Sequence, residues 1–241
     1  MNELYLELLR KFRANISNNT RLANLKITNF EDVKKYAELV SDELMYLLRE
    51  NIDLGSFTQE LGDQGVEPLI RECYRLINQA CREANLVLID ELGMSLNPAE
   101  AIYDVYNAYE VVNVMNKYPE FTEEAIQEIL KTMYTANNRV VDSNIRSNAE
   151  FMDDAGMKVT VTRIYDGRGL HGGKDRCKWC LERCGTDVPY HEALSRGMFE
   201  RHNGCGCTII YKTARGTTYQ DSKGKWYNES ERQARIKLAN G

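Results

Sequence analysis

Two short motifs rich in cysteine and histidine constrain the fold of this chain more than any other feature. The first is Cys177-x-x-Cys180, and the second is His202-x-x-Cys205-x-Cys207. Thiolate and imidazole are the ligands that zinc prefers, and four of them complete a closed tetrahedral site. The segment between the motifs is long enough to fold back and bring the second onto the first. The spacing therefore predicts a structural metal site, with Zn²⁺ as the expected ion.

A tetrahedral ion takes four ligands, whereas the two motifs offer five. Cys177, Cys180 and Cys205 are the first choices. His202 and Cys207 compete for the fourth position, and the sequence leaves that choice open. The alternative interpretation is that all of these cysteines are reduced core residues of a small β-domain, since a free thiol packs as a small hydrophobe.

The distribution of cysteine favours a metal over disulfides. Of the seven cysteines, the five that include Cys184 fall within residues 177–207, and all three histidines lie in or beside that window. We recognise no N-terminal secretion signal, so we expect reduced thiols. Cys184 is interpreted as a bystander, and Cys73 and Cys81 as core residues of a helix.

No residue is predicted to be catalytic or to bind an organic cofactor. A zinc deaminase would carry an H-x-E motif and a zinc protease an H-E-x-x-H motif, and the chain has neither. Glu200 is the carboxylate nearest to the second motif, and we interpret it as a surface residue. Gly167-x-Gly169-x-x-Gly172 resembles a dinucleotide fingerprint. It leads into the first cysteine motif and not into a helix, however, and so predicts a tight loop.

The N-terminal part of the chain is expected to be helical. Apolar residues recur there at the three- and four-residue spacing of one helix face, over 30–51, 66–92 and 122–148. In addition, Asn97-Pro98-Ala99-Glu100 is typical of a helix start, which predicts a further helix over 99–118.

The pattern changes near residue 156. Residues 158–165 and 208–212 alternate like strands, and residues 189–196 are typical of a short helix that ends at a glycine. We therefore expect an α+β chain, in which an N-terminal helical bundle precedes a small zinc-stabilised β-rich domain. The predicted division is an acidic helical domain, a basic β domain and a charged tail, over 1–155, 156–228 and 229–241.

Charge is distributed unevenly along the chain. Residues 1–155 hold 15 Lys and Arg against 27 Asp and Glu, whereas residues 156–241 hold 16 against 9. Basic side chains can neutralise phosphates, although they can equally form a solvated face. Those nearest to the motifs are Arg163, Arg168, Lys174, Arg176, Lys178, Arg183, Arg196 and Arg201. No apolar run approaches the roughly 20 residues of a membrane span, so no membrane contact is expected.

The motifs and their surroundings resemble a known family. The stretch YDGRGLHGG from Tyr165, the CKWC motif, and PYHEALSRGMFERHNGCGCTIIY from Pro189 are similar to the C-terminal region of phage minor head proteins, broadly the Mu F-like group. That family carries a C-x-x-C and, downstream, an H-x-x-C-x-C box that commonly ends in threonine, as at Thr208. The resemblance covers roughly residues 158–228. It is closest to a compact variant from tailed phages of Gram-positive bacteria.

The resemblance implies a virion component and not an enzyme. Such proteins associate with the portal or the inside of the capsid and take part in head morphogenesis. They are found in the phage head, and in the host cytoplasm during assembly. From the charge distribution we draw the hypothesis that the acidic helical part docks on a portal or capsid protein, while the basic 156–241 region faces packaged DNA.

Two alternative functions are a zinc-dependent nuclease and an ADP-ribosyltransferase-like effector. A zinc-dependent nuclease would need a His-Asn-His arrangement or a cluster of carboxylates, and we find neither in the sequence. An ADP-ribosyltransferase-like effector would rest on Arg163 and Tyr165 of the first expected strand.

Overall fold

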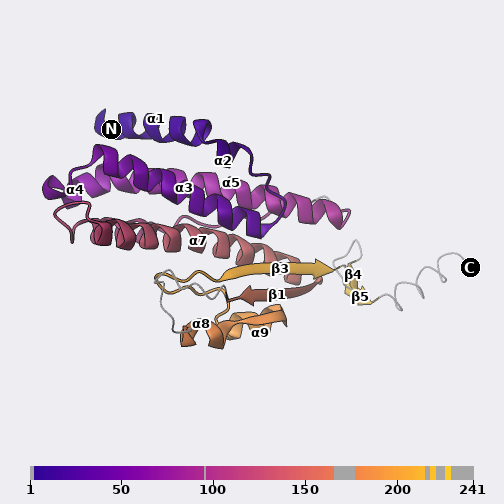
Figure 1. The fold of residues 1–241 in the computed structure, drawn as a ribbon. Coiled ribbons are helices and arrows are strands. Elements are labelled where there is room, and N and C mark those ends of the chain that lie inside the picture. The colour runs from indigo at the N-terminus through magenta and orange to yellow at the C-terminus, as the bar shows by residue number, and fades with distance from the viewer. Residues whose placement is uncertain (1–2, 95, 166–176, 215–217, 221–225, 229–241) are drawn as a thin grey trace, which may run out of the picture.

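The computed structural model describes residues 3–94, 96–165, 177–214, 218–220 and 226–228. Helices form the N-terminal part, and a small antiparallel sheet follows near the C-terminus (Figure 1). The predicted charged tail over 229–241 lies outside the described residues, as does the glycine-rich stretch 167–173. The helical elements of the N-terminal part are α1 (Glu3–Asn18), α2 (Thr20–Ala23), α3 (Phe30–Asn51), the 3₁₀ turn η1 (Leu54–Ser56), α4 (Gln59–Leu61), the π-helical turn η2 (Gly62–Val66), α5 (Glu67–Glu91), α6 (Val105–Met115) and α7 (Glu123–Asp154).

The three long helices α3, α5 and α7 pack against one another, and α1 lies on α3 and α5. Their bounds agree closely with the three helices predicted from apolar spacing, and the 32-residue α7 is the longest, as expected. Thr122 caps its start by accepting a hydrogen bond from the backbone N–H of Ala125. Cys73 and Cys81 are fully buried core residues of α5, which confirms their interpretation.

The helix predicted over 99–118 is wrong over its first six residues, and the observed helix also ends earlier, at Met115. The chain over 97–104 is extended, and α6 begins only at Val105, with the side chain of Asp104 as its cap. The reason is tertiary. Asn148 of α7 bonds both the backbone N–H and the backbone C=O of Ala99, and Asn144 accepts the N–H of Ala101. These bonds satisfy the backbone without a helix, which removes the advantage of the local start signal.

The sheet consists of β1 (Lys158–Ile164), β2 (Gly185–Pro189) and β3 (Thr208–Ala214), in the antiparallel order β2-β1-β3. Both predicted strands are therefore confirmed. Val161 lies opposite Val188 on one side and Tyr211 on the other. Two short helices accompany the sheet, α8 (Lys178–Arg183) and α9 (Tyr190–Ser195). The latter confirms the short helix that was expected to end at Gly197, whose φ is +64°. Two further strands, β4 (Thr218–Gln220) and β5 (Trp226–Asn228), pair as a hairpin.

One hydrophobic core joins the bundle to the sheet. The buried cluster that contains Val33 and Ile145 of the helices also contains Val161 of β1 and Ile209 of β3. In Figure 1 the sheet lies alongside α7, and α8 and α9 lie on its far side. A second, smaller cluster consists of Cys180, Cys205 and Cys207, with Trp179 packed against it. The cysteine cluster thus has its own small core beside the common one.

Candidate metal centre

The five predicted ligands come together from two segments of the chain. Cys177 caps α8 and Cys180 lies within it, while the other three residues lie in the loop that leads into β3. His202 Nε2 lies 3.3 Å from Cys177 Sγ and 3.0 Å from Cys180 Sγ. Cys180 Sγ lies 3.6 Å from Cys205 Sγ, and Cys207 clusters with both of these cysteines. The predicted convergence of the two motifs is therefore confirmed.

These separations suit a tetrahedral ion. With Zn–S bonds of about 2.3 Å and Zn–N bonds of about 2.0 Å, the edges of a tetrahedron are about 3.8 Å between two sulfurs and about 3.5 Å between sulfur and nitrogen. The three observed distances, 3.3, 3.0 and 3.6 Å, are all shorter than the corresponding edges. These side chains would therefore move slightly apart to seat an ion, and Cys180 belongs to both of the groups in which the prospective ligands lie, Cys177 with Cys180 and His202, and Cys180 with Cys205 and Cys207.

The imidazole of His202 is oriented for ligation through one nitrogen. Its Nδ1 lies 2.8 Å from the carbonyl oxygen of Asn203, so Nδ1 carries the proton and donates it there. Nε2 is then the unprotonated nitrogen, and it faces the sulfurs of Cys177 and Cys180. The ring of Trp179 meets the imidazole edge-on at 5.1 Å between centroids. A carbonyl that fixes the tautomer in this way is a common companion of metal-bound histidine.

Two buried arginines hold the second motif. Arg201 is 8 % exposed and forms a bidentate ion pair with Asp142 of α7, with N–O distances of 2.7 and 2.9 Å. The same guanidinium donates to the carbonyl oxygens of Cys205 and Cys207 at 2.8 and 3.0 Å. It therefore connects the backbone of the loop that carries the second motif directly to the bundle.

Arg163 has a similar role from within β1. It is 2 % exposed and donates to the carbonyl oxygens of Met198 and Glu200. Its second terminal nitrogen lies 3.3 Å from Cys205 Sγ. Both Arg163 and Arg201 were grouped with the phosphate-contacting side chains in the sequence. Their burial shows that they serve the interior of the protein instead, a role that the charge pattern did not reveal.

The electrostatics favour a thiolate at Cys205. A hydrogen bond from Cys207 lowers the pKa of Cys205 to about 4, and the cations of Arg201 and Arg163 act in the same direction against desolvation. The same hydrogen bond, with burial, raises the pKa of Cys207. Burial also raises the pKa of Cys180, to about 12. A thiolate is thus stabilised at one ligand before an ion binds, while Cys180 must exchange its proton for the metal.

The loop that carries the second motif is also fixed to the helices. Gly204 has a φ of +79°, which only glycine adopts without strain, and its N–H donates to Thr135 Oγ1 of α7 at 2.8 Å. The amide of Asn203 contacts the same hydroxyl and that of Thr132. On the other side, Lys34 of α3 donates to the carbonyl oxygen of Gly206. The bundle thereby determines the path of the loop.

The remaining candidates lie around this centre. Cys184 packs against the cysteine cluster but belongs to neither group of prospective ligands, which agrees with its interpretation as a bystander. The guanidinium of Arg183 lies 3.8 Å from the ring centroid of Trp179 and makes an ion pair with Glu200 at 3.5 Å. Glu200 is accordingly engaged at the surface.

No described helix has the length and apolar character that crossing a membrane would require. Comparisons with protein-family models, with curated proteins and with solved structures find no match for this chain.

Proposed function

We propose that Cys177, Cys180, His202 and Cys205 bind one structural zinc ion. The observation that carries this proposal is the approach of His202 Nε2 to both sulfurs of the first motif, combined with the contact of Cys180 and Cys205. In this arrangement Cys207 is the hydrogen-bond partner of Cys205 and not a ligand. Four protein ligands leave no open position, so the ion would stabilise the fold and would not perform catalysis.

The metal content of purified variants tests this assignment. Elemental analysis of the full chain is expected to give one zinc per molecule, lost in Cys177→Ser and in His202→Ala. Cys184→Ser is the matched control and should keep its zinc. Cys207→Ser should also keep it, with an affinity lowered roughly 10- to 100-fold because a supporting contact is lost. Retention of zinc by His202→Ala together with its loss from Cys207→Ser would instead make Cys207 the fourth ligand.

We further propose that the chain is a structural component of a tailed-phage head, a minor head protein associated with the portal or the inner capsid. The resemblance over residues 158–228 supports this, because the two boxes on which it depends lie together in the fold. The metal ligands lie beside a bundle whose sequence carries most of the acidic residues, and that bundle offers a surface for a protein partner.

Contact with packaged DNA is part of the same proposal, and the structure limits which residues would make it. Arg163 and Arg201 are internal, so the contact falls to exposed cations such as Lys158, Lys178 and Lys212. Lys212 already has a weak exposed partner in Asp187 at 3.5 Å. We therefore expect salt-sensitive binding of low sequence specificity.

Analysis of virions tests the head assignment. Mass spectrometry of purified particles made by the genome that encodes this chain should detect it at few copies per particle, and deletion of its gene should yield defective heads. Absence of the chain from intact particles would overturn the proposal without affecting the zinc assignment.

A further inference from the structure

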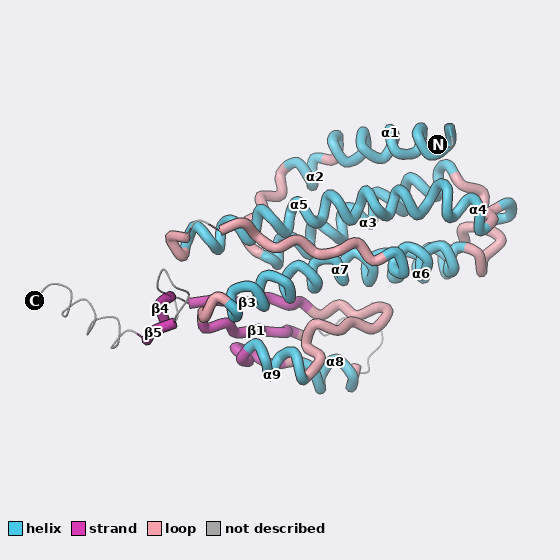
Figure 2. Tube along the Cα trace, turned by 180° about the vertical axis from the view of Figure 1, so that it is seen from behind, coloured by secondary structure: helices cyan, strands magenta, loops and turns pink. Residues whose placement is uncertain are grey.

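Residues 96–104, which precede α6, run along the outside of the bundle. Figure 2 shows them as a long loop that passes along the helices before α6 begins. The inner side of this segment is bonded to the bundle at alternate residues. Asn148 binds the N–H and C=O of Ala99 at 2.9 and 2.7 Å. Asn144 accepts the N–H of Ala101 at 3.4 Å, and the hydroxyl of Tyr74 donates to the C=O of the same residue.

The outer side of this segment has unpaired backbone groups. Successive residues of an extended chain direct their N–H and C=O groups to opposite sides, so Glu100 and Ile102 direct theirs away from the bundle. Within the described parts of the chain, neither backbone has a hydrogen-bond partner. Backbone groups left open along one side of a chain, as at the edge of a sheet, are the groups with which a further strand can pair.

Apolar side chains accompany this edge. Ile102 is 91 % exposed and Tyr106 is 75 % exposed, whereas most apolar residues of the bundle are covered. Beside them lies a cavity of about 320 Å³, whose lining includes the aromatic rings of Tyr74, Tyr103 and Phe199. The same lining includes charged residues such as Asp104 and Arg139, so the cavity is mixed in character. Its aromatic part, next to the exposed Ile102, provides a place for the apolar side chain of a bound strand.

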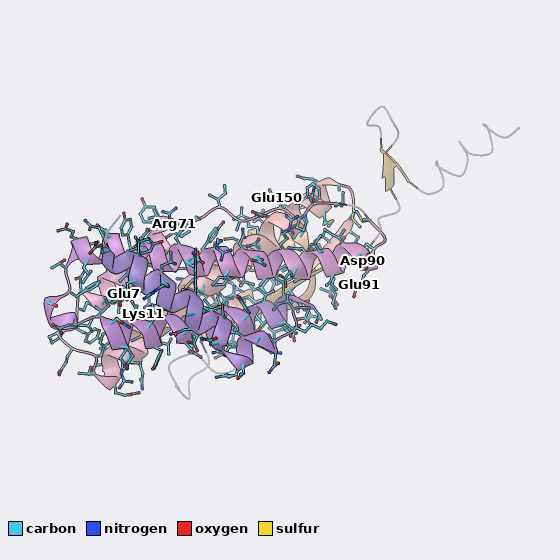
Figure 3. The ribbon with its side chains drawn as sticks, turned by 90° about the horizontal axis from the view of Figure 1, so that it is seen from above. Glu7, Lys11, Arg71, Asp90, Glu91 and Glu150 are labelled. Carbon is cyan, nitrogen blue, oxygen red and sulfur yellow. The ribbon has the colours of Figure 1, made fainter. Side chains whose placement is uncertain are left out.

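The charge around this edge favours a partner strand of positive charge. Residues 51–155 hold 19 Asp and Glu against 7 Lys and Arg. Exposed acids lie at both ends of the extended segment, and Figure 3 shows two of them at the end of α5. They are Asp90, Glu91, Glu100, Asp104 and Glu110. Glu100 and Glu110 already form ion pairs with Arg82 and Arg139, so Asp90, Glu91 and Asp104 supply most of the negative charge offered to a partner. A cationic strand fits this rim, and an anionic one is repelled by it.

We propose that the edge formed by residues 99–103 binds, by β-strand addition, an extended segment of a partner protein in which cationic and branched apolar residues alternate. The backbone groups of Glu100 and Ile102 pair with the partner's backbone, its apolar side chains cover Ile102 and enter the adjacent cavity, and its cations lie against the acidic rim. The cavity extends to Glu200 and Arg201 beside the second cysteine motif, but none of the proposed metal ligands lines it, and the proposal does not depend on the proposed function.

Binding of three designed decapeptides to the full chain tests the proposal. The probe alternates lysine and valine. A second peptide alternates lysine and proline, so that it keeps the charge but lacks half of the N–H donors. The third alternates glutamate and valine. Fluorescence anisotropy at low salt should show the lysine–valine peptide binding at least ten times more tightly than either control, and amide exchange at Glu100 and Ile102 should slow in its presence.

Two variants distinguish edge pairing from general attraction. Ile102→Pro removes an N–H that makes no hydrogen bond within the described parts of the chain, and it should weaken binding at least ten-fold. Leu86→Ala, on the exposed face of α5, is the matched control and should change binding less than two-fold. Equal binding of the two lysine peptides, unchanged binding by Ile102→Pro, or no lysine–valine binding at millimolar concentration would each overturn the proposal. Protection of the same amides on self-association alone, without peptide, would assign the edge to a second copy and overturn it too.

Discussion

Among single residues, Arg201 and Asp142 form a buried ion pair that links the loop carrying the second cysteine motif to α7. Both side chains are almost fully covered, at 2 % and 4 % exposure. The pair is surrounded by further polar partners, since Arg201 also donates to two loop carbonyls. Burial of a charge is tolerated only where such partners are complete.

The variant Asp142→Asn is therefore expected to destabilise the protein by about 3–5 kcal/mol, because it leaves Arg201 buried without its counter-charge. Chemical denaturation of the purified chain measures this. Asp187→Asn is a matched control, because its pair with Lys212 is exposed and long, and its loss should cost no more than about 1 kcal/mol. Equal effects of the two substitutions would contradict the structural role given to Arg201.

A second residue-scale prediction concerns stability in acid. Glu72 of α5 is buried and is bonded by Arg75 and Arg13, which hold its pKa at about 2, below the usual 4.5, although burial opposes them. Because the folded pKa is the lower one, the stabilisation is complete above pH 4.5 and is lost as the pH falls from there towards 2. Glu72→Gln should reduce the free energy of unfolding at neutral pH by on the order of 2 kcal/mol, since both arginines are exposed to solvent.

Unfolding measured between pH 2 and 7 tests this prediction. The variant should have a flatter pH dependence than the parent below pH 4.5, and the two curves should converge near pH 2. A constant difference between the curves over the whole range would show that the substitution acts through packing and not through the charge.

At the scale of elements, the long helices could be predicted from sequence because their apolar stripes are local. The spacing of the cysteines and the histidine within each motif is also local, so the candidate metal centre could be located from the sequence alone. The extended segment over 97–104 could not be predicted. Its backbone is bonded by Asn144 and Asn148, which lie more than 40 residues away in sequence. The inward roles of Arg163 and Arg201 were hidden for the same reason, as their partners are distant in the chain.

Asn148 provides the test at this scale, because its side chain replaces the missing helix bonds of Ala99. Asn148→Ala leaves the N–H and C=O of Ala99 unsatisfied next to the bundle and should cost about 1–3 kcal/mol. Amide exchange at Ala99 should accelerate with little change at α3. Asn97→Ala is the exposed control in the same segment and should leave stability almost unchanged. Unchanged exchange at Ala99 in Asn148→Ala would mean that Asn148 does not hold the extended segment.

At the scale of the whole molecule, the bundle and the sheet share one core, and the metal-binding loop is fixed to α3 and α7 by Lys34, Thr135 and Asp142. A perturbation at the centre should therefore pass to the helices. In two independently folded domains, loss of the ion would instead unfold only the C-terminal part.

Removal of zinc distinguishes these two behaviours, and it is best followed in a Trp226→Phe background, where Trp179 beside His202 is the only tryptophan. Thermal unfolding is recorded with a chelator and with excess zinc, by helical circular dichroism and by Trp179 fluorescence. Both signals should shift together to lower temperature on chelation. At zinc concentrations a thousand times its dissociation constant, the ion should contribute about 4 kcal/mol. Cys184→Ser is the control and should respond to the chelator as the parent does. A helical transition that stays in place while the fluorescence transition moves would mean that the shared core does not couple the centre to the bundle.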